Sequence, residues 1–115
     1  MRIDSGTLYT RNYYKDQAPV SLASARIVVP CVIDFVRPTS VVDVGCGVGA
    51  WLSVFQEYGV RRIVGLDGAY VDRSLLMIPH DACFNVDLRS PFCLDETFDL
   101  ALSLEVAEHL PPRSA

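Results

Sequence analysis

The distribution of apolar residues divides the chain near residue 20. Over residues 1–20 neither a period of two nor one of 3.6 is sustained, so we expect an irregular lead or a loosely held helix there. From Ser21 the apolar residues recur at helical spacing; Ser21 is a suitable N-cap, and Pro38 ends the pattern. These signals predict a helix over about 21–36, with a bend or break at Pro30, which has no backbone N–H to donate.

Short apolar runs separated by turn-rich segments follow this helix. The runs at 41–44 and 62–66 are nearly all apolar, as expected of strands that are covered on both faces. The alternation of strands and helices predicts an α/β, Rossmann-like, doubly wound sheet of mostly parallel strands, truncated to about four strands. The other elements expected are a helix at 48–58, a short helix around 70–78, and strands at 83–86 and 98–104.

Length and composition favour one domain without a membrane span. The 115 residues are 50% apolar and 21% charged, which suffices for a single hydrophobic core. No uninterrupted apolar run approaches the ~18–20 residues that cross a bilayer, and no secretory signal opens the chain, so we expect a cytoplasmic protein without a membrane partner. A net charge of −4 without a basic cluster argues against nucleic acid. The four cysteines lack metal-site spacing and are expected to be free thiols.

A glycine-rich string follows the first predicted strand. It reads Asp-Val-Gly-Cys-Gly-Val-Gly-Ala over residues 43–50. A strand that turns sharply into a helix needs glycine where φ is positive and where a ligand approaches the backbone, and we assign these tasks to Gly45 and Gly47. With Ala50 the string also satisfies the dinucleotide fingerprint, so by itself it leaves a nicotinamide cofactor open.

A single carboxylate follows the second predicted strand. Asp67 lies 22 positions beyond Gly45 and precedes Gly68, a residue typical of turns. One carboxylate at a strand tip can accept hydrogen bonds from both hydroxyls of a ribose diol. We therefore assign Asp67, with Gly68 beside it, to a nucleoside-binding site. In isolation, Asp67 would be interpreted as an exposed turn residue.

Four motifs, taken in order, resemble those of the class I S-adenosylmethionine-dependent methyltransferases. They are Asp43–Gly49, Asp67, the pair at 87–88 and the string at 103–111, and the resemblance covers about residues 21–112. A nicotinamide-dependent dehydrogenase would share the first two motifs, but its pattern does not require the others. The resemblance implies a Rossmann-like fold, S-adenosyl-L-methionine as cofactor and S-adenosyl-L-homocysteine as product.

The resemblance also implies roles for individual residues. The glycines would let the backbone pass beside the methionine moiety, and Asp43 would help to fix the turn and the cofactor's amino group. Asp67 would hold the ribose hydroxyls. Asp87 and the backbone N–H of Leu88 would bind the adenine, although Asp87 can also be interpreted as an ordinary loop carboxylate. Two further residues line the pocket near the sulfonium in similar enzymes, here Leu104 and Glu105.

Few catalytic groups are needed, because a sulfonium methyl is already activated. A general base is required only where the acceptor loses a proton, and His109 or Glu108 is the candidate. Tyr13 and Tyr14 could close over the pocket, although plain packing is the commoner role of tyrosines. Glu105, Glu108 and His109 could hold a divalent ion on one helix face. Such a site needs a further ligand, and we predict no metal.

The family's sheet has seven strands, whereas this chain provides about four. We therefore divide it into a lead at 1–20 and a partial S-adenosylmethionine-binding domain at 21–115, and interpret it as part of a longer methyltransferase that acts on a small molecule. The strand expected at 98–104 would be an apolar edge that favours self-association. Two alternatives stay open, an NAD-dependent oxidoreductase fragment and a non-catalytic remnant that serves as an interaction module.

Overall fold

The fold alternates helices with short parallel strands. The computed structural model describes residues 11–68 and 72–104, with side chains described from residue 18 onward. The elements in chain order are α2 (Arg11–Val36), β1 (Ser40–Val44), α3 (Ala50–Glu57), β2 (Arg62–Asp67), the 3₁₀ turns η1 (Arg73–Leu75) and η2 (His80–Ala82), β3 (Cys83–Asn85) and β4 (Leu100–Leu102).

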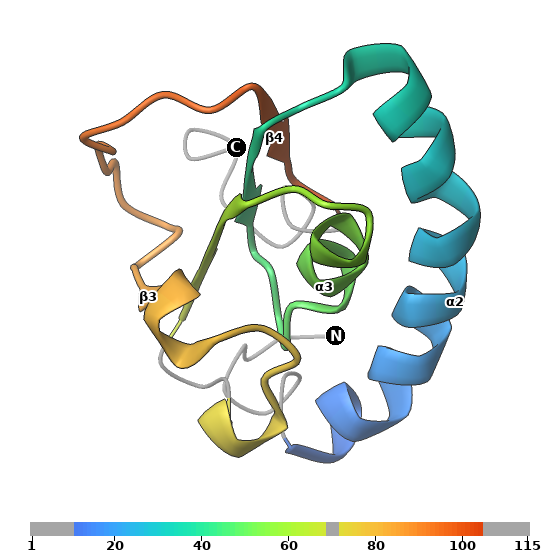
Figure 1. Cartoon of the computed structure of the whole chain (residues 1–115). Coiled ribbons are helices and arrows are strands. Elements are labelled where there is room, and N and C mark those ends of the chain that lie inside the picture. The colour runs from blue at the N-terminus through green and yellow to red at the C-terminus, as the bar shows by residue number, and fades with distance from the viewer. Residues whose placement is uncertain (1–10, 69–71, 105–115) are drawn as a thin grey trace.

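The strands form one parallel sheet in the order β3-β2-β1-β4. β1 lies inside it, with Ser40 opposite Arg62 and Val44 opposite Leu66 on β2. Helix α3 makes the crossover from β1 to β2 and packs on both strands, and α2 packs on α3 (Figure 1). The α/β, Rossmann-like prediction is confirmed.

The predicted bounds hold best where a strand is buried. β1, β2 and β3 each lie within one residue of the expected runs, whereas β4 pairs over only three residues of the run at 98–104. Between β2 and β3 the described part of the expected helix is the single turn η1. The Asp72 side chain caps this turn by accepting a hydrogen bond from the Ser74 N–H at 2.9 Å.

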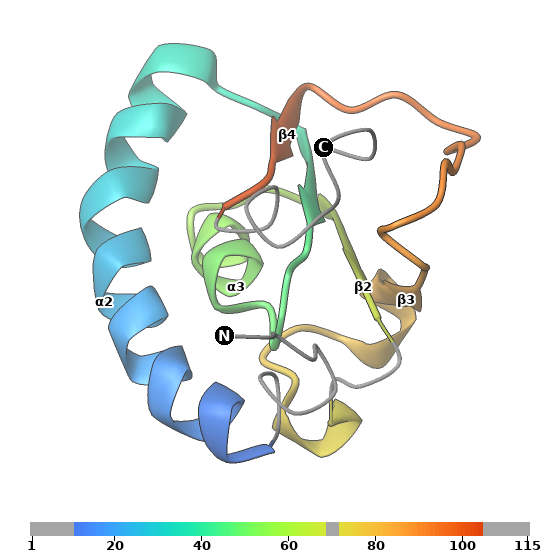
Figure 2. The ribbon, with the colours of Figure 1, turned by 180° about the vertical axis from the view of Figure 1, so that it is seen from behind.

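Helix α2 is longer than the sequence pattern indicates. It begins at Arg11, so residues 11–20 are helical rather than an irregular lead, and it continues through Pro19 and Pro30 without a break (Figure 2). Each proline removes one backbone donor, but packing offsets that cost: Ala25 and Val29 are fully buried in the core on the α3 side.

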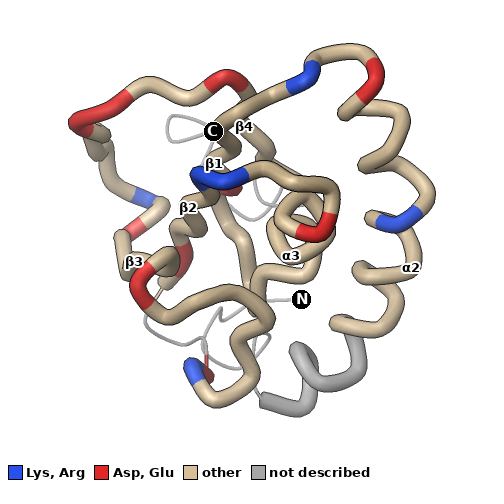
Figure 3. The backbone as a smooth tube through the Cα atoms, viewed as in Figure 1, with Lys and Arg blue, Asp and Glu red and all other residues tan. Residues whose placement is uncertain are grey.

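The outer face of α2 is apolar and exposed. Ile27 is 74% and Phe35 is 91% exposed, and Figure 3 shows few charged residues over 18–36, the part of this helix whose side chains are described. Its segment Ala18–Val36 is long and apolar enough to cross a membrane, with 11% of that window buried. A single helix of this kind is weak evidence, because a mostly buried core helix of a soluble protein and a signal sequence near the N-terminus meet the same criterion. A cytoplasmic location stays a prediction.

β4 lies at one edge of the described sheet and is anchored at its start. The Asp99 carboxylate accepts hydrogen bonds from the Thr39 backbone N–H at 2.7 Å and the Thr39 hydroxyl at 2.8 Å. In return the Asp99 N–H donates to the Ser40 hydroxyl at 2.9 Å. These bonds fix the register of β4 against β1. Self-association through β4 stays a prediction.

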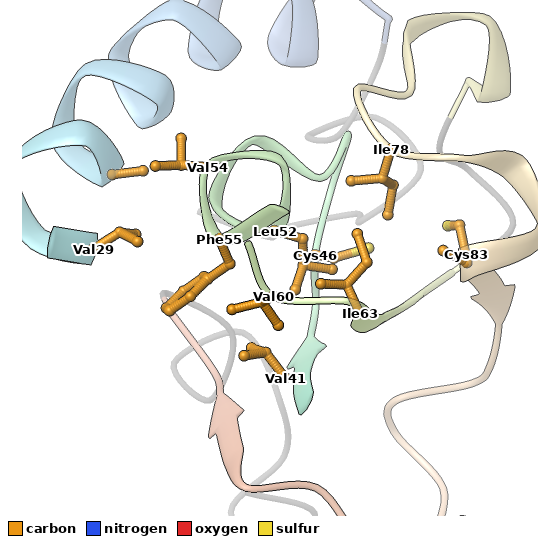
Figure 4. Close-up of a cluster of buried hydrophobic side chains, with 12 residues drawn as sticks. Val29, Val41, Cys46, Leu52, Val54, Phe55, Val60, Ile63, Ile78 and Cys83 are labelled. Atoms are coloured by element: carbon orange, nitrogen blue, oxygen red, sulfur yellow. The ribbon is translucent and has the colours of Figure 1, made fainter. Parts of the chain in front are cut away.

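The main core lies between the sheet and the two helices, where Leu52 and Phe55 of α3 are almost completely buried (Figure 4). Gly65 of β2 provides a close approach within this core. A Cβ atom at Gly65 would lie 2.6 Å from the Cys46 sulfur and 3.1 Å from the Cys46 Cβ. The absence of a side chain at Gly65 therefore lets the turn after β1 pack onto β2.

We expect Gly65→Ala to destabilise the fold by about 1–3 kcal/mol, the usual cost of overpacking a core. The added methyl group collides mainly with the Cys46 sulfur, so the double variant with Cys46→Ala should recover part of the loss. Urea unfolding of the two single variants and the double variant measures this coupling. Strictly additive losses would show that the Gly65 and Cys46 sites do not compete for space.

Candidate functional site

The site candidates converge because all four described strands point the same way. Parallel strands end at one edge of the sheet, so the turn after β1, the end of β2 and the loop after β3 are neighbours there. The turn after β1 leaves the strand with Gly45 at φ 81° and Gly47 at φ 57°, both left-handed. The N–H groups of Gly45 and Cys46 donate to the Leu66 carbonyl at 2.7 and 3.1 Å, which fastens the turn to β2.

Asp67, the last residue of β2, holds the glycine turn from the other side. Its side chain is buried, at 4% exposure, and Oδ2 accepts a hydrogen bond from the Gly47 N–H at 2.6 Å. Oδ1 accepts a second bond from the Gly68 N–H at 2.7 Å. A carboxylate oxygen can accept two hydrogen bonds, so these contacts are compatible with further donors from a ligand. The predicted residues Gly47, Asp67 and Gly68 therefore lie together.

Asp43 is a second buried carboxylate at this edge. It is 3% exposed, and its Oδ1 has no hydrogen-bond partner in the part of the chain that the structure describes. Burial, and then repulsion from Asp67, raise the pKa of Asp43 to about 8. A buried oxygen without a donor is costly, and it is the feature expected of a group that receives its partner from a ligand.

The raised pKa of Asp43 predicts a stability that depends on pH. The unfolded carboxyl has the ordinary value of 3.8 and the folded one about 8, so the protonated form favours folding and stability falls as pH rises between these values. The loss has a limiting slope of about 1.4 kcal/mol per pH unit. Asp43→Asn should remove this pH-dependent loss. The stability of the variant relative to the parent chain should therefore increase from about pH 5 to pH 8.

Urea unfolding of both proteins across that range tests this prediction, because their difference cancels the contributions of other titrating groups. Asp95→Asn is the matched control, since it removes the same charge at an exposed position. Parallel curves for the parent and Asp43→Asn would show that Asp43 is ionised without cost.

The segment at 76–78, which was expected to be helical and was given no role in the site, packs against the glycine turn. The Met77 N–H donates to the Val48 carbonyl at 2.7 Å, and Ile78 packs against Gly49 so closely that a Cβ at Gly49 would meet it at 2.9 Å. Ile78 is buried in the main core. No local signal marked Ile78, because its role depends on how the loop after β2 returns beneath the turn.

Asp87 follows β3 and lies in a local turn. Its exposed carboxylate accepts hydrogen bonds from the Arg89 backbone N–H at 3.0 Å, the Arg89 side chain at 3.3 Å and the Ser90 hydroxyl at 3.4 Å. The bonds from Arg89 hold the pKa of Asp87 below its usual value. Leu88 is half-buried in the same turn, and Leu104 is exposed beyond β4.

The remaining candidates lie outside the described residues. Glu105, Glu108 and His109 follow the last described position, and the side chains of Tyr13 and Tyr14 precede the first one. The proposed base, the proposed lid and the ion site considered for the string at 105–109 therefore have no geometry here. Within residues 18–68 and 72–104, no three metal-ligating side chains form a group that could hold an ion.

Comparison with known proteins adds one finding. A family model described as "Methyltransferase domain" matches residues 17–115, which is most of the chain. No curated protein and no solved structure matches it. The matched region contains the glycine turn, both buried carboxylates and every described strand.

Proposed function

Because the chain belongs to the methyltransferase-domain family, we propose that it binds S-adenosyl-L-methionine at the carboxyl edge of its sheet for methyl transfer to a small molecule. The observation that carries this proposal is the pair of buried carboxylates, Asp43 and Asp67, that flank a left-handed glycine turn. Aliphatic packing does not require two buried acids so close together. A ligand with a cationic group and hydroxyl donors compensates for their burial.

The residues present suit different parts of such a ligand. Asp67 is held by two backbone N–H groups and is thereby oriented to accept from a ribose diol. Asp43 Oδ1, which has no hydrogen-bond partner among the described residues, suits the ammonium group of the methionine moiety, and that group would favour the ionised carboxylate. Asp87 and Leu88 are assigned to the adenine, and Leu104 and Glu105 to the region near the sulfonium.

Methyl transfer from this cofactor requires few catalytic groups from the protein. The cofactor supplies an activated methyl group, so the chain's tasks are to bind, to orient and to exclude water. His109 or Glu108 would accept a proton where the acceptor loses one. A net charge of −4 disfavours a nucleic acid acceptor and leaves a small molecule as the proposed one.

Calorimetric titration with S-adenosyl-L-homocysteine, the reaction product, tests the proposal without knowledge of the acceptor. We expect saturable binding of this product and none of NAD, and a melting temperature raised by the product alone. Binding of NAD instead would assign the glycine turn to an oxidoreductase. If the folded chain bound neither ligand, the proposed cofactor site would be excluded. The interaction module would then be the remaining alternative.

A further inference from the structure

Two buried cysteines meet beside the glycine turn. Cys46 lies between Gly45 and Gly47, and Cys83 begins β3 on the far side of β2. Gly65 of β2 is the register partner of Cys83, and its missing side chain leaves the space that the Cys46 sulfur occupies. Both side chains belong to one buried cluster, with the Cys46 sulfur on the side that faces Cys83 (Figure 4).

The two thiols are in contact and differ in acidity. Together, this contact and the positive charge of Arg73 lower the pKa of Cys83 to about 7, against the effect of burial. Arg73 is held in place by a 2.7 Å bond from its guanidinium to the His80 carbonyl. The same contact, followed by burial, raises the pKa of Cys46. Cys83 is therefore the better nucleophile, and Cys46 retains its proton.

We propose that a hydroperoxide oxidises Cys46 and Cys83 to a disulfide, and that this bond closes the glycine turn to the cofactor. The second half of the inference rests on the proposed function. The pair is reduced in the structure, where all four cysteines are free. Residual exposures of 8% for Cys46 and 5% for Cys83 suit a small oxidant better than a bulky one.

The reaction takes two steps that balance. The Cys83 thiolate attacks one peroxide oxygen, the O–O bond breaks as an S–O bond forms, and the second oxygen leaves as hydroxide or alkoxide and is protonated to water or alcohol. The Cys46 sulfur then attacks the sulfenic acid of Cys83. An S–S bond forms, the S–O bond breaks, and hydroxide leaves with the Cys46 proton as water. Two electrons pass from the sulfurs to the peroxide.

The bond should move the turn rather than the sheet. A disulfide brings its sulfurs to about 2.05 Å, well inside the distance of two thiols in non-bonded contact. Cys83 is held by strand pairing with β2, whereas Cys46 has a glycine on either side and the more deformable backbone. A shift of Cys46 toward β3 displaces Gly47, whose N–H donates to Asp67. The site that those two residues form is then lost.

Mass spectrometry tests the bond independently of any ligand. The chain with Cys31→Ser and Cys93→Ser keeps only the buried pair, because these two substitutions remove the exposed thiols. After hydrogen peroxide treatment and non-reducing tryptic digestion, we expect peptides 27–61 and 74–89 to be joined, lighter by two hydrogens than their sum. Separate peptides, with thiols or with individually oxidised sulfurs, would overturn the inference.

Calorimetry with S-adenosyl-L-homocysteine tests the closure on the same protein. We expect the oxidised form to bind at least about tenfold more weakly and dithiothreitol to restore the affinity. Cys83→Ala in this background cannot form the bond, so peroxide should leave its affinity unchanged. Equal affinity of the cross-linked and reduced forms would overturn the closure. A reduced chain that binds no product contradicts the proposed function instead, and the peptide map still decides the disulfide.

Discussion

Asp67→Asn is expected to weaken the binding of S-adenosyl-L-homocysteine by about 100-fold, which is the largest single effect expected of a polar substitution in this site. The carboxylate carries a negative charge, and both of its oxygens are hydrogen-bond acceptors. The N–H groups of Gly47 and Gly68 hold these two oxygens in place. An asparagine keeps the shape but replaces one oxygen with an NH₂ donor, which must face either a backbone N–H or the ligand's hydroxyl. Isothermal titration of the parent chain and the variant gives the ratio of affinities.

The same substitution should also cost stability, because the charge-assisted bond to one of the two backbone donors is lost. We expect the free energy of unfolding, measured in urea, to fall by about 1.5–3 kcal/mol. Affinities are therefore compared at a temperature at which the variant is still folded. Asp95→Asn removes an equal charge at an exposed position and should change neither quantity. Unchanged affinity in a folded Asp67→Asn chain would mean that Asp67 only supports the turn.

The sequence predicted this fold well where burial dictates the pattern. Largely apolar runs such as 41–44 and 62–66 have few structures open to them other than covered strands, and the residues that separate them are too many for a hairpin. For residues 11–20 the weak pattern left an irregular lead and a loosely held helix open, and the structure has the helix. That stretch is the first part of a helix whose later residues, Ala25 and Val29, are buried against α3.

The site was predictable to the level of strand ends and no further. The family resemblance assigned Asp43 and Asp67 to one cofactor site, and the structure brings the two side chains close together at one edge of the sheet. The hydrogen bond from Gly47 to Asp67 depends on the left-handed turn, and the nearness of Cys46 to Cys83 depends on the strand order and on Gly65. Such contacts join residues far apart in the chain, so spacing along the sequence carries no signal of them.

The second large effect concerns the glycine turn itself. Gly47→Ala adds one methyl group at φ 57°, where we propose that the cofactor passes beside the backbone. We expect binding of S-adenosyl-L-homocysteine to weaken by about 10- to 100-fold, the range for one unwanted methyl group in a close-fitting site. Left-handed backbone also disfavours alanine by about 1–2 kcal/mol, so a fall in affinity alone could reflect strain rather than contact.

Gly59→Ala separates these two causes. Gly59 has φ 93° at the end of α3, and a Cβ there would meet nothing within 4 Å. Alanine is therefore strained at both positions, but only Gly47 faces Asp67 across the proposed site. We expect both variants to lose about 1–2 kcal/mol of stability in urea and only Gly47→Ala to lose affinity. If the two variants bound the product equally well, the backbone at Gly47 would not be in contact with it, and the cofactor would have to lie elsewhere along the sheet edge.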